Sequence, residues 1–262
     1  MSLLKNLKTD ASIQGEQDRI GGGGAIESNV YDLTIDMAYI TVSEEKTDGD
    51  GKVTGGAMAV TIIYKQENGK EITDTQYVTG GADKGKKNTY LDKDKNEQYL
   101  PGFLIMDAVA MLTLGKSISD LETEDKLVEV YDFQAKAKVA KKLPVITELI
   151  GKKLVAGILR VVANKKVKQQ NGSYAVTNDK STFNEVSKIF CARDDFKHMT
   201  VAEIRAKKAD PSVTAKFYDE WKNNYAGKDK DTFKPVDGAP AGTSGGSQTA
   251  SGATAPKTSL FG

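Results

Sequence analysis

Lysines and tyrosines gather between positions 77 and 90, where the chain reads YVTGGADKGKKNTY. Both tyrosines alternate with polar residues, so an extended chain places their rings on polar faces. Lysine neutralises phosphate charge, and an exposed ring gives an unpaired base a surface on which to stack. This segment therefore indicates contact with single-stranded nucleic acid through Tyr77, Lys84, Lys86, Lys87 and Tyr90.

A second cluster of basic residues lies between positions 135 and 168. This range holds ten lysines and arginines against one acid, Glu148, although the whole chain carries a formal charge of only +1. Concentrated positive charge attracts a polyanion, whereas the plainer interpretation is a solvated lysine-rich surface. We expect several strands to line one basic groove, with backbone contacts from Lys136, Lys138, Arg160, Lys166 and Lys168.

Catalytic and metal chemistry has few candidate residues in this chain. Cys191 and His198 are the only residues of their types, which excludes an intramolecular disulfide and a Cys/His zinc cluster. The run GGADKGKK resembles a phosphate-binding loop, but Lys87 stands where that loop needs Ser or Thr for magnesium. We expect no catalytic residue, no metal and no cofactor. A metal-dependent nuclease, the enzyme alternative, would need a tight cluster of acids.

The elements that must position these residues are mostly strands. Segment 30–42 alternates apolar and polar residues, which is typical of a half-buried strand, with Tyr31 and Tyr39 facing the core. Strands at 57–65 and 71–79, a short hairpin at 86–100 and a buried helix from Pro101 are expected to follow. Two longer strands, at 127–139 and 154–168, come next. We also expect Tyr64, Tyr131 and Phe133 in the core, because their rings lie on the same strand faces as aliphatic side chains.

Helices are expected near the C-terminal end. Segments 181–192, 200–208 and 211–225 each begin with Ser, Thr or Pro, which are common at helix starts. From Gly227 the chain is rich in Gly, Ala, Ser, Thr and Pro and lacks the apolar residues needed for a core. No signal peptide or membrane-spanning stretch is visible, so we expect an intracellular protein without a membrane.

Strands that do not alternate regularly with helices favour a mainly β fold. The expected architecture is an antiparallel OB-like barrel with an inserted helix, short C-terminal helices and a disordered tail. The expected divisions are an N-terminal arm at 1–24, the nucleic-acid-binding barrel at 25–180, a helical extension at 181–226 and the disordered tail at 227–262.

Four runs of the chain resemble the single-stranded DNA-binding proteins of short-tailed bacteriophages. They are GGGGAIESNVYDLTIDMAYI, TQYVTGGADKGKKNTYLDKDKNEQYLPGF, KLPVITELIGKKLVAGILRVVANK and FYDEWKNNYAGK. The resemblance covers roughly residues 10–230. The resemblance implies an OB-type barrel that binds and protects single-stranded DNA during phage replication and recombination in the host cell cytoplasm, without catalysis. It also implies that phage or host replication proteins bind the tail, although residues 227–262 hold four Lys and three Asp instead of an acidic run.

One alternative class stays open from the sequence. A non-catalytic virion structural or interaction protein would carry the same lysines as a merely solvated surface. Such a protein is expected to assemble without DNA, which separates the two classes in solution.

Overall fold

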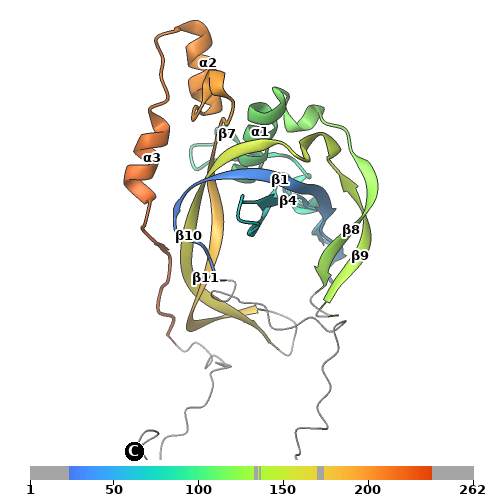
Figure 1. Cartoon of the computed structure of the whole chain (residues 1–262). Helices are drawn as coiled ribbons and strands as arrows, with labels where there is room; N and C mark the ends of the chain where they lie inside the picture. The colour runs from blue at the N-terminus through green and yellow to red at the C-terminus, as the bar shows by residue number, and fades with distance from the viewer. Residues whose placement is uncertain (1–23, 133–134, 136, 170–173, 238–262) are drawn as a thin grey trace, which may run out of the picture.

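The computed structural model describes residues 24–132, 135, 137–169 and 174–237. The protein is mainly β, with one eight-stranded sheet that is antiparallel except at its last short strand (Figure 1). The main path of the sheet runs in the order β11-β10-β1-β4-β5. Its strands are β1 (Asn29–Val42), β4 (Met58–Lys65), β5 (Glu71–Tyr77), β10 (Lys153–Lys168) and β11 (Tyr174–Phe190).

The sheet branches at β1. One edge of β1 pairs first with β10 and then, at Tyr39, with Val145 of β9 (Ala137–Val145), while the other edge pairs with β4. Strand β8 (Glu124–Asp132) pairs only with β9. The β8–β9 and β10–β11 hairpins therefore leave β1 as two separate arms, which Figure 1 shows on opposite sides of the sheet.

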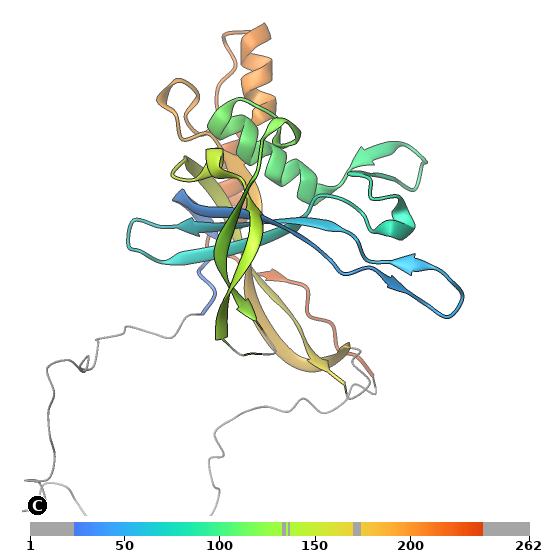
Figure 2. The same cartoon turned by 90° about the vertical axis from the view of Figure 1, so that its right-hand side faces the viewer.

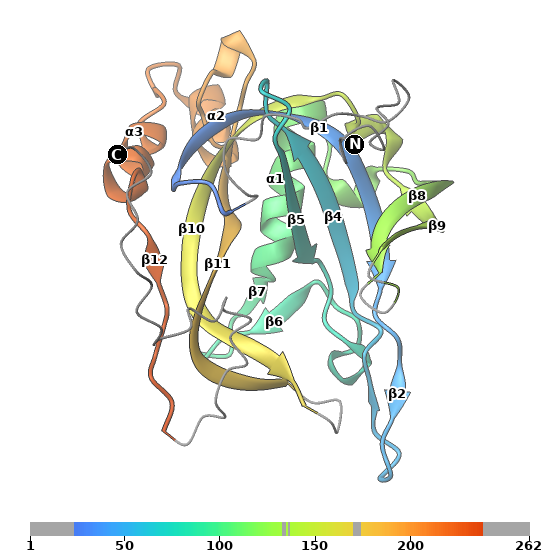
Figure 3. The same ribbon diagram turned by 60° about the horizontal axis from the view of Figure 1, so that its bottom comes forward.

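Helix α1 (Pro101–Leu114) packs inside the curved sheet. It begins at a proline, whose fixed φ suits the first helical position, and ends at Gly115 in the left-handed conformation with φ 76°. Its Met106 and Val109 are fully buried in one apolar cluster with Ile35 and Ile62 of the sheet. Figure 3 shows α1 between β5 and β11, the two edges of the main path.

The two remaining helices follow β11. Helix α2 (Val201–Ala209) begins with a capping box formed by Thr200 and Glu203. Helix α3 (Phe217–Tyr225) places Trp221 against Gly157 of β10, so α3 covers the outer face of a strand whose inner face belongs to the main core. Among the described residues, none of the helices has the length and apolar character that crossing a membrane requires.

Short elements complete the connections. Two hairpins project from the sheet, β2 (Lys46–Thr47) with β3 (Val53–Thr54) and β6 (Thr89–Leu91) with β7 (Glu97–Tyr99) (Figure 2). Single 3-10 turns are η2 (Ala82–Lys84), η3 (Ile118–Asp120), η4 (Thr147–Leu149) and η5 (Asp194–Phe196).

The mainly β, antiparallel class is confirmed, but the sheet does not close. Strands β5 and β11 are its edges and are not paired with each other, because α1 lies across the opening between them. The OB-like barrel is therefore not confirmed.

Two elements differ from the prediction. The expected strand at 127–139 is a hairpin, since the chain reverses between Asp132 and Ala137. Consequently Tyr131, expected in the core, is 54% exposed, and Phe133 lies outside the described residues. The expected helix at 181–192 is the second half of β11. Its apolar residues have helical spacing because Ser187 is an extra residue opposite the Gly157–Ile158 step, and this bulge shifts the side-chain alternation.

The prediction of an unpacked tail from Gly227 is wrong for its first eleven residues. Strand β12 (Lys230–Asp231) pairs in parallel with Val161 and Val162 of β10. Further along, the backbones of Lys234 and Val236 each exchange two hydrogen bonds with a side-chain amide, of Asn164 and Asn178 respectively. Figure 3 shows this extension following the β10–β11 arm. Residues 238–262 lie outside the described residues.

Candidate nucleic-acid interface

Tyr77, Lys84 and Tyr90 line one groove of about 630 Å³. The groove lies between the end of β5, the loop at 80–88, β6 and the first residues of α1. We call it the stacking groove. The structure thus brings together three of the five site residues expected between positions 77 and 90.

Both tyrosine rings are accessible from solvent. Tyr77, the last residue of β5, is 58% exposed, and Tyr90, the middle residue of β6, is 44% exposed. The polar-face prediction is therefore confirmed for both rings. Neither ring fills the core, so both are free to offer their faces to a planar ligand.

The loop that carries Lys84 is held in place by close backbone contacts. The Ala82 N–H donates to the Gly55 carbonyl at 2.6 Å, and the Gly80 N–H donates to the Lys87 carbonyl at 2.7 Å. A Cβ on Gly81 would lie 2.8 Å from the Gly55 carbonyl oxygen, so only glycine permits this approach. The lysine is therefore positioned by a fixed turn beside the groove.

Helix α1 points its N-terminus toward the same groove. Leu100, Pro101 and Gly102 line it, and no side chain caps the helix. The first turn of a helix carries partial positive charge from unpaired N–H groups. This charge adds to that of Lys84, which makes none of the ion pairs found among the described residues.

Lys86 and Lys87 line a second groove of about 610 Å³ on the other side of β6. Both grooves include Thr79 and Thr89. The ring of Tyr99 on β7 also lines this second groove and stacks on Phe103 with a centroid separation of 5.1 Å. Sequence reasoning missed Tyr99, although its position opposite Thr89 in the expected hairpin was the available signal.

Lys86 differs from its two neighbours in its charge environment. It forms an ion pair with Glu45 at 2.5 Å and has a positive φ of 55°. Its charge is therefore partly compensated, while Lys84 and Lys87 have no such partner among the ion pairs of the described residues.

The remaining basic candidates do not share one groove. Lys138 lies on the β8–β9 arm, directly opposite Tyr131, and Lys136 lies outside the described residues. The acids of β8 lie alongside the lysines of β9, with an ion pair of 3.3 Å between Asp125 and Lys142. The charge imbalance of the 135–168 segment is thus largely cancelled on this arm by residues earlier in the chain.

Arg160 has a structural partner instead of a free charge. Its Nε donates to Asp229 at 2.6 Å, and this hydrogen bond and the attraction of the carboxylate raise the arginine pKa. Its backbone N–H donates to the Ser28 hydroxyl at 2.8 Å. Arg160 therefore ties the C-terminal extension to β10, a role that the sequence prediction did not include.

Lys166 and Lys168 lie near the far end of the β10–β11 arm. They are exposed and share one face of β10, as expected. Their cross-strand partners are Val176 and Tyr174. The predicted residues that the structure describes are thus divided between the two grooves beside β6 and the two long arms.

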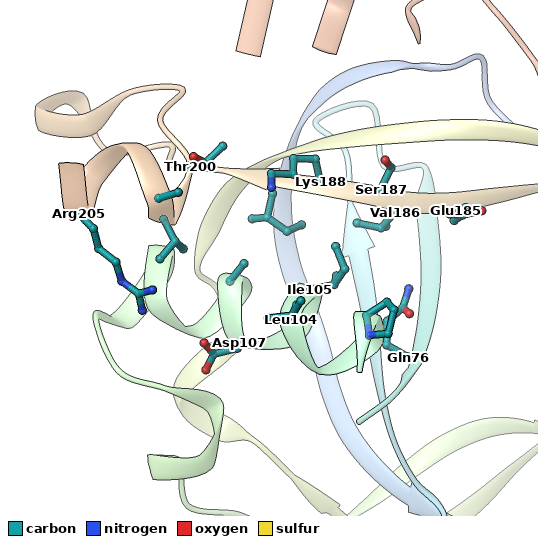
Figure 4. A pocket seen from close by; sticks show the side chains of 15 residues that line it. Gln76, Leu104, Ile105, Asp107, Glu185, Val186, Ser187, Lys188, Thr200 and Arg205 are labelled. Carbon is teal, nitrogen blue, oxygen red and sulfur yellow. The ribbon is translucent and has the colours of Figure 1, made fainter. Parts of the chain in front are cut away.

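A third hollow, of about 530 Å³, lies between α1, α2 and β11 (Figure 4). Figure 4 shows Leu104 and Ile105 of α1 across from Lys188 of β11, with Arg205 on α2. Its lining includes no aromatic ring, so it offers no stacking platform of the kind found beside Lys84.

Acidic residues near this hollow have internal partners. Asp107 accepts hydrogen bonds from the Ser117 hydroxyl and the Ile118 N–H, and Glu185 forms an ion pair with Lys230 at 2.9 Å. No group of three or more His, Cys, Asp or Glu residues suited to a metal ion occurs in the part of the chain that the structure describes.

Comparison with family models, with curated proteins and with solved structures gives no match to this chain. The function is therefore inferred from the chemistry of the residues themselves.

Proposed function

We propose that this protein binds single-stranded DNA without reading its sequence and protects it during phage DNA replication and recombination. The observation that carries the proposal is the stacking groove. Its lining combines two exposed rings, Tyr77 and Tyr90, with Lys84, a cation that makes none of the ion pairs found among the described residues. Stacking platforms beside positive charge are the common means of binding single strands.

Binding follows from the separate roles of these groups. Bases of an unpaired strand stack on the two tyrosine rings, and every base offers a π-face, so the contact tolerates any sequence. Phosphates lie near Lys84 and the uncapped start of α1, while Lys87 extends the positive charge to the neighbouring groove.

Single strands fit this arrangement better than duplex DNA. Bases in a duplex are stacked on each other and their faces are not available to Tyr77 and Tyr90. Reading a duplex requires a helix or ribbon that enters the major groove. Helix α1 is not available for this role, because its first residues line the stacking groove and its buried side chains pack in the core.

The test is binding of a fluorescent oligothymidine, followed by anisotropy, against a duplex of the same length. We expect wild-type protein to prefer the single strand. Tyr90→Ala should weaken binding by about 1 to 3 kcal/mol, the usual value of a lost base–ring stack, and Tyr90→Phe should retain most of the affinity.

A matched control is Tyr225→Ala on α3. Tyr225 is 43% exposed, close to the value for Tyr90, but its ring packs beside Trp221, away from the groove residues. This control should bind DNA normally. Tighter binding to duplex, or oligomers that form without DNA and ignore the oligonucleotide, would reject the proposal; the second result would favour the virion class.

A further inference from the structure

The far end of the β10–β11 arm repeats the chemistry of the stacking groove at a separate place. Tyr174 is 66% exposed and pairs across the strands with Lys168. Lys166 lies two residues from Lys168 and therefore on the same face. An exposed ring thus stands beside two exposed cations on one face of a two-stranded arm.

The local charge of this arm is strongly positive. Residues 163–183 contain four lysines and one acid, Asp179. The β8–β9 arm is different, because residues 124–145 contain five lysines and four acids. Two of its lysines, Lys126 and Lys142, form ion pairs with acids of β8. The β10–β11 arm therefore carries the larger net charge, 4 − 1 = +3 against 5 − 4 = +1, and is the better match for a polyanion.

The arm reaches well beyond the rest of the sheet. Its strand pairing with β1 ends at Ile158 and that with β12 ends at Val162, and the six residues from Val162 to Lys168 extend about 20 Å at the usual rise of a strand. Figures 1 and 2 show the end of the arm far from α1, whose first residues line the stacking groove. Its contacts are therefore separate from those of the groove.

The C-terminal extension holds the arm in place. The side-chain amides of Asn164 and Asn178 each form two hydrogen bonds with the backbone of this extension, and Lys180 lies over the ring of Phe233 at 5.1 Å. These contacts occupy Lys180 and leave Lys166 and Lys168, with no ion pair among the described residues, for an outside ligand.

We propose that the end of the β10–β11 arm is a second contact for the same DNA strand, in which Tyr174 stacks on a base and Lys166 and Lys168 contact phosphates. This inference rests on the proposed function. Two linked contacts raise affinity only for a strand long enough to reach both. Affinity must then rise steeply between short and long oligonucleotides.

The test compares oligothymidines of about 6 and about 30 nucleotides. The first is near the lower limit of the usual site sizes of single-strand binders, about 4 to 16 nucleotides, and the second is well above them. The variant combines Tyr174→Ala with Lys166→Ala and Lys168→Ala. It should bind the long strand about 10-fold or more weakly and the short strand as wild type does. Its salt dependence on the long strand should fall by about 1.4 in slope, or 0.7 for each lost phosphate contact.

Two controls separate this effect from general damage. Lys126→Ala with Lys142→Ala removes the same charge from the other arm, where both lysines are already paired. These changes should leave long-strand binding nearly unchanged. Tyr174→Phe keeps the ring and should retain affinity.

The outcomes distinguish the two proposals. If wild-type protein binds neither strand, the proposed function fails and the second contact fails with it. If wild type binds but the arm variant binds the long strand equally well, or loses affinity for both lengths alike, only the second contact is rejected. A melting temperature measured for each variant shows that the fold is retained.

Discussion

The second residue of α1, Gly102, packs directly against the backbone of Tyr77. A Cβ on Gly102 would overlap the Tyr77 carbonyl oxygen and lie 3.1 Å from its carbonyl carbon. Both residues line the stacking groove. The spacing between the start of α1 and the end of β5 therefore depends on the absence of a single side chain.

Gly102→Ala should disturb both stability and DNA binding. The added methyl meets backbone atoms, which cannot rotate away, so we expect a loss of about 1 to 3 kcal/mol in the free energy of unfolding. Movement of α1 should also displace Tyr77 and weaken binding to single strands. Urea denaturation and anisotropy measure the two effects.

Gly49→Ala is the matched control for this change. A Cβ on Gly49 meets nothing within 4 Å and its φ is not in the left-handed region. This variant should behave as wild type. Equal stability of the two variants would show that α1 does not depend on this close contact.

Salt dependence reports the phosphate contacts of the grooves. If about five phosphates are neutralised, the slope of log affinity against log salt for a single strand is about −3.5. Lys84→Ala with Lys87→Ala should reduce its magnitude by up to about 1.4, for every sequence alike, because phosphate contacts carry no sequence information. Titrations at several salt concentrations measure the slope, and a wild-type slope near zero would mean that these lysines are only solvated.

The local parts of the fold and site could be predicted from the sequence. Strands β1, β4, β5 and β10 and the start of α1 follow from alternation and from Pro101. The exposure of Tyr77 and Tyr90 follows from their polar neighbours. Each of these features depends on residues within a few positions, where periodicity is informative.

Bulges explain several of the errors. In β1 the pairing with β4 shifts at Asp36, so the side chain of Ala38 is buried, and Tyr39, expected in the core, is only half-buried. Tyr31 packs against the core, and Tyr64 is fully buried as predicted. An extra residue reverses every later side chain of a strand, and nothing in its local sequence distinguishes Asp36 from an ordinary polar position.

The basic region could not be located from the sequence because charge depends on pairing. Lysines of β9 meet acids of β8, and Arg160 meets Asp229 sixty-nine residues later. These partners are distant in sequence or belong to a hairpin that was expected as one strand. A charge count along the chain therefore overestimated the net positive charge of the β8–β9 arm. It also could not show that this arm and the β10–β11 arm are separate.

Two truncations test the C-terminal extension. Removing residues 238–262, which the composition predicts to form no core, should leave the melting temperature and DNA affinity unchanged. Removing residues 227–262 also deletes β12, the Arg160–Asp229 pair and the hydrogen bonds to Asn164 and Asn178. At about 0.5 to 1.5 kcal/mol for each net hydrogen bond, the four bonds to Asn164 and Asn178 alone should contribute about 2 kcal/mol or more. Equal melting temperatures for the two truncations would contradict this role.

Stability should depend on pH through Asp74 of β5. This carboxyl is 7% exposed, and burial raises its pKa to about 6, against a hydrogen bond from Gln76 that lowers it and the nearby charge of Glu185 that raises it further. Its Oδ2 atom and the buried hydroxyl of Tyr64 have no hydrogen-bond partner in the described structure. The charged form of Asp74 is therefore poorly accommodated.

The direction of the effect follows from the raised pKa. Between its ordinary pKa of 3.8 and about 6, the folded protein binds the Asp74 proton more tightly than the unfolded chain does. The stabilising contribution of Asp74 is fully present below pH 3.8 and is lost as the pH rises through about 6. For a pKa difference of about two units, the loss is up to about 3 kcal/mol. Asp74→Asn carries no titrating proton, so the difference in free energy of unfolding between variant and wild type should grow in favour of the variant from about pH 4 to pH 7. Urea denaturation at intervals across this range measures the difference; a difference that stays constant would show that the folded and unfolded chains hold this proton equally.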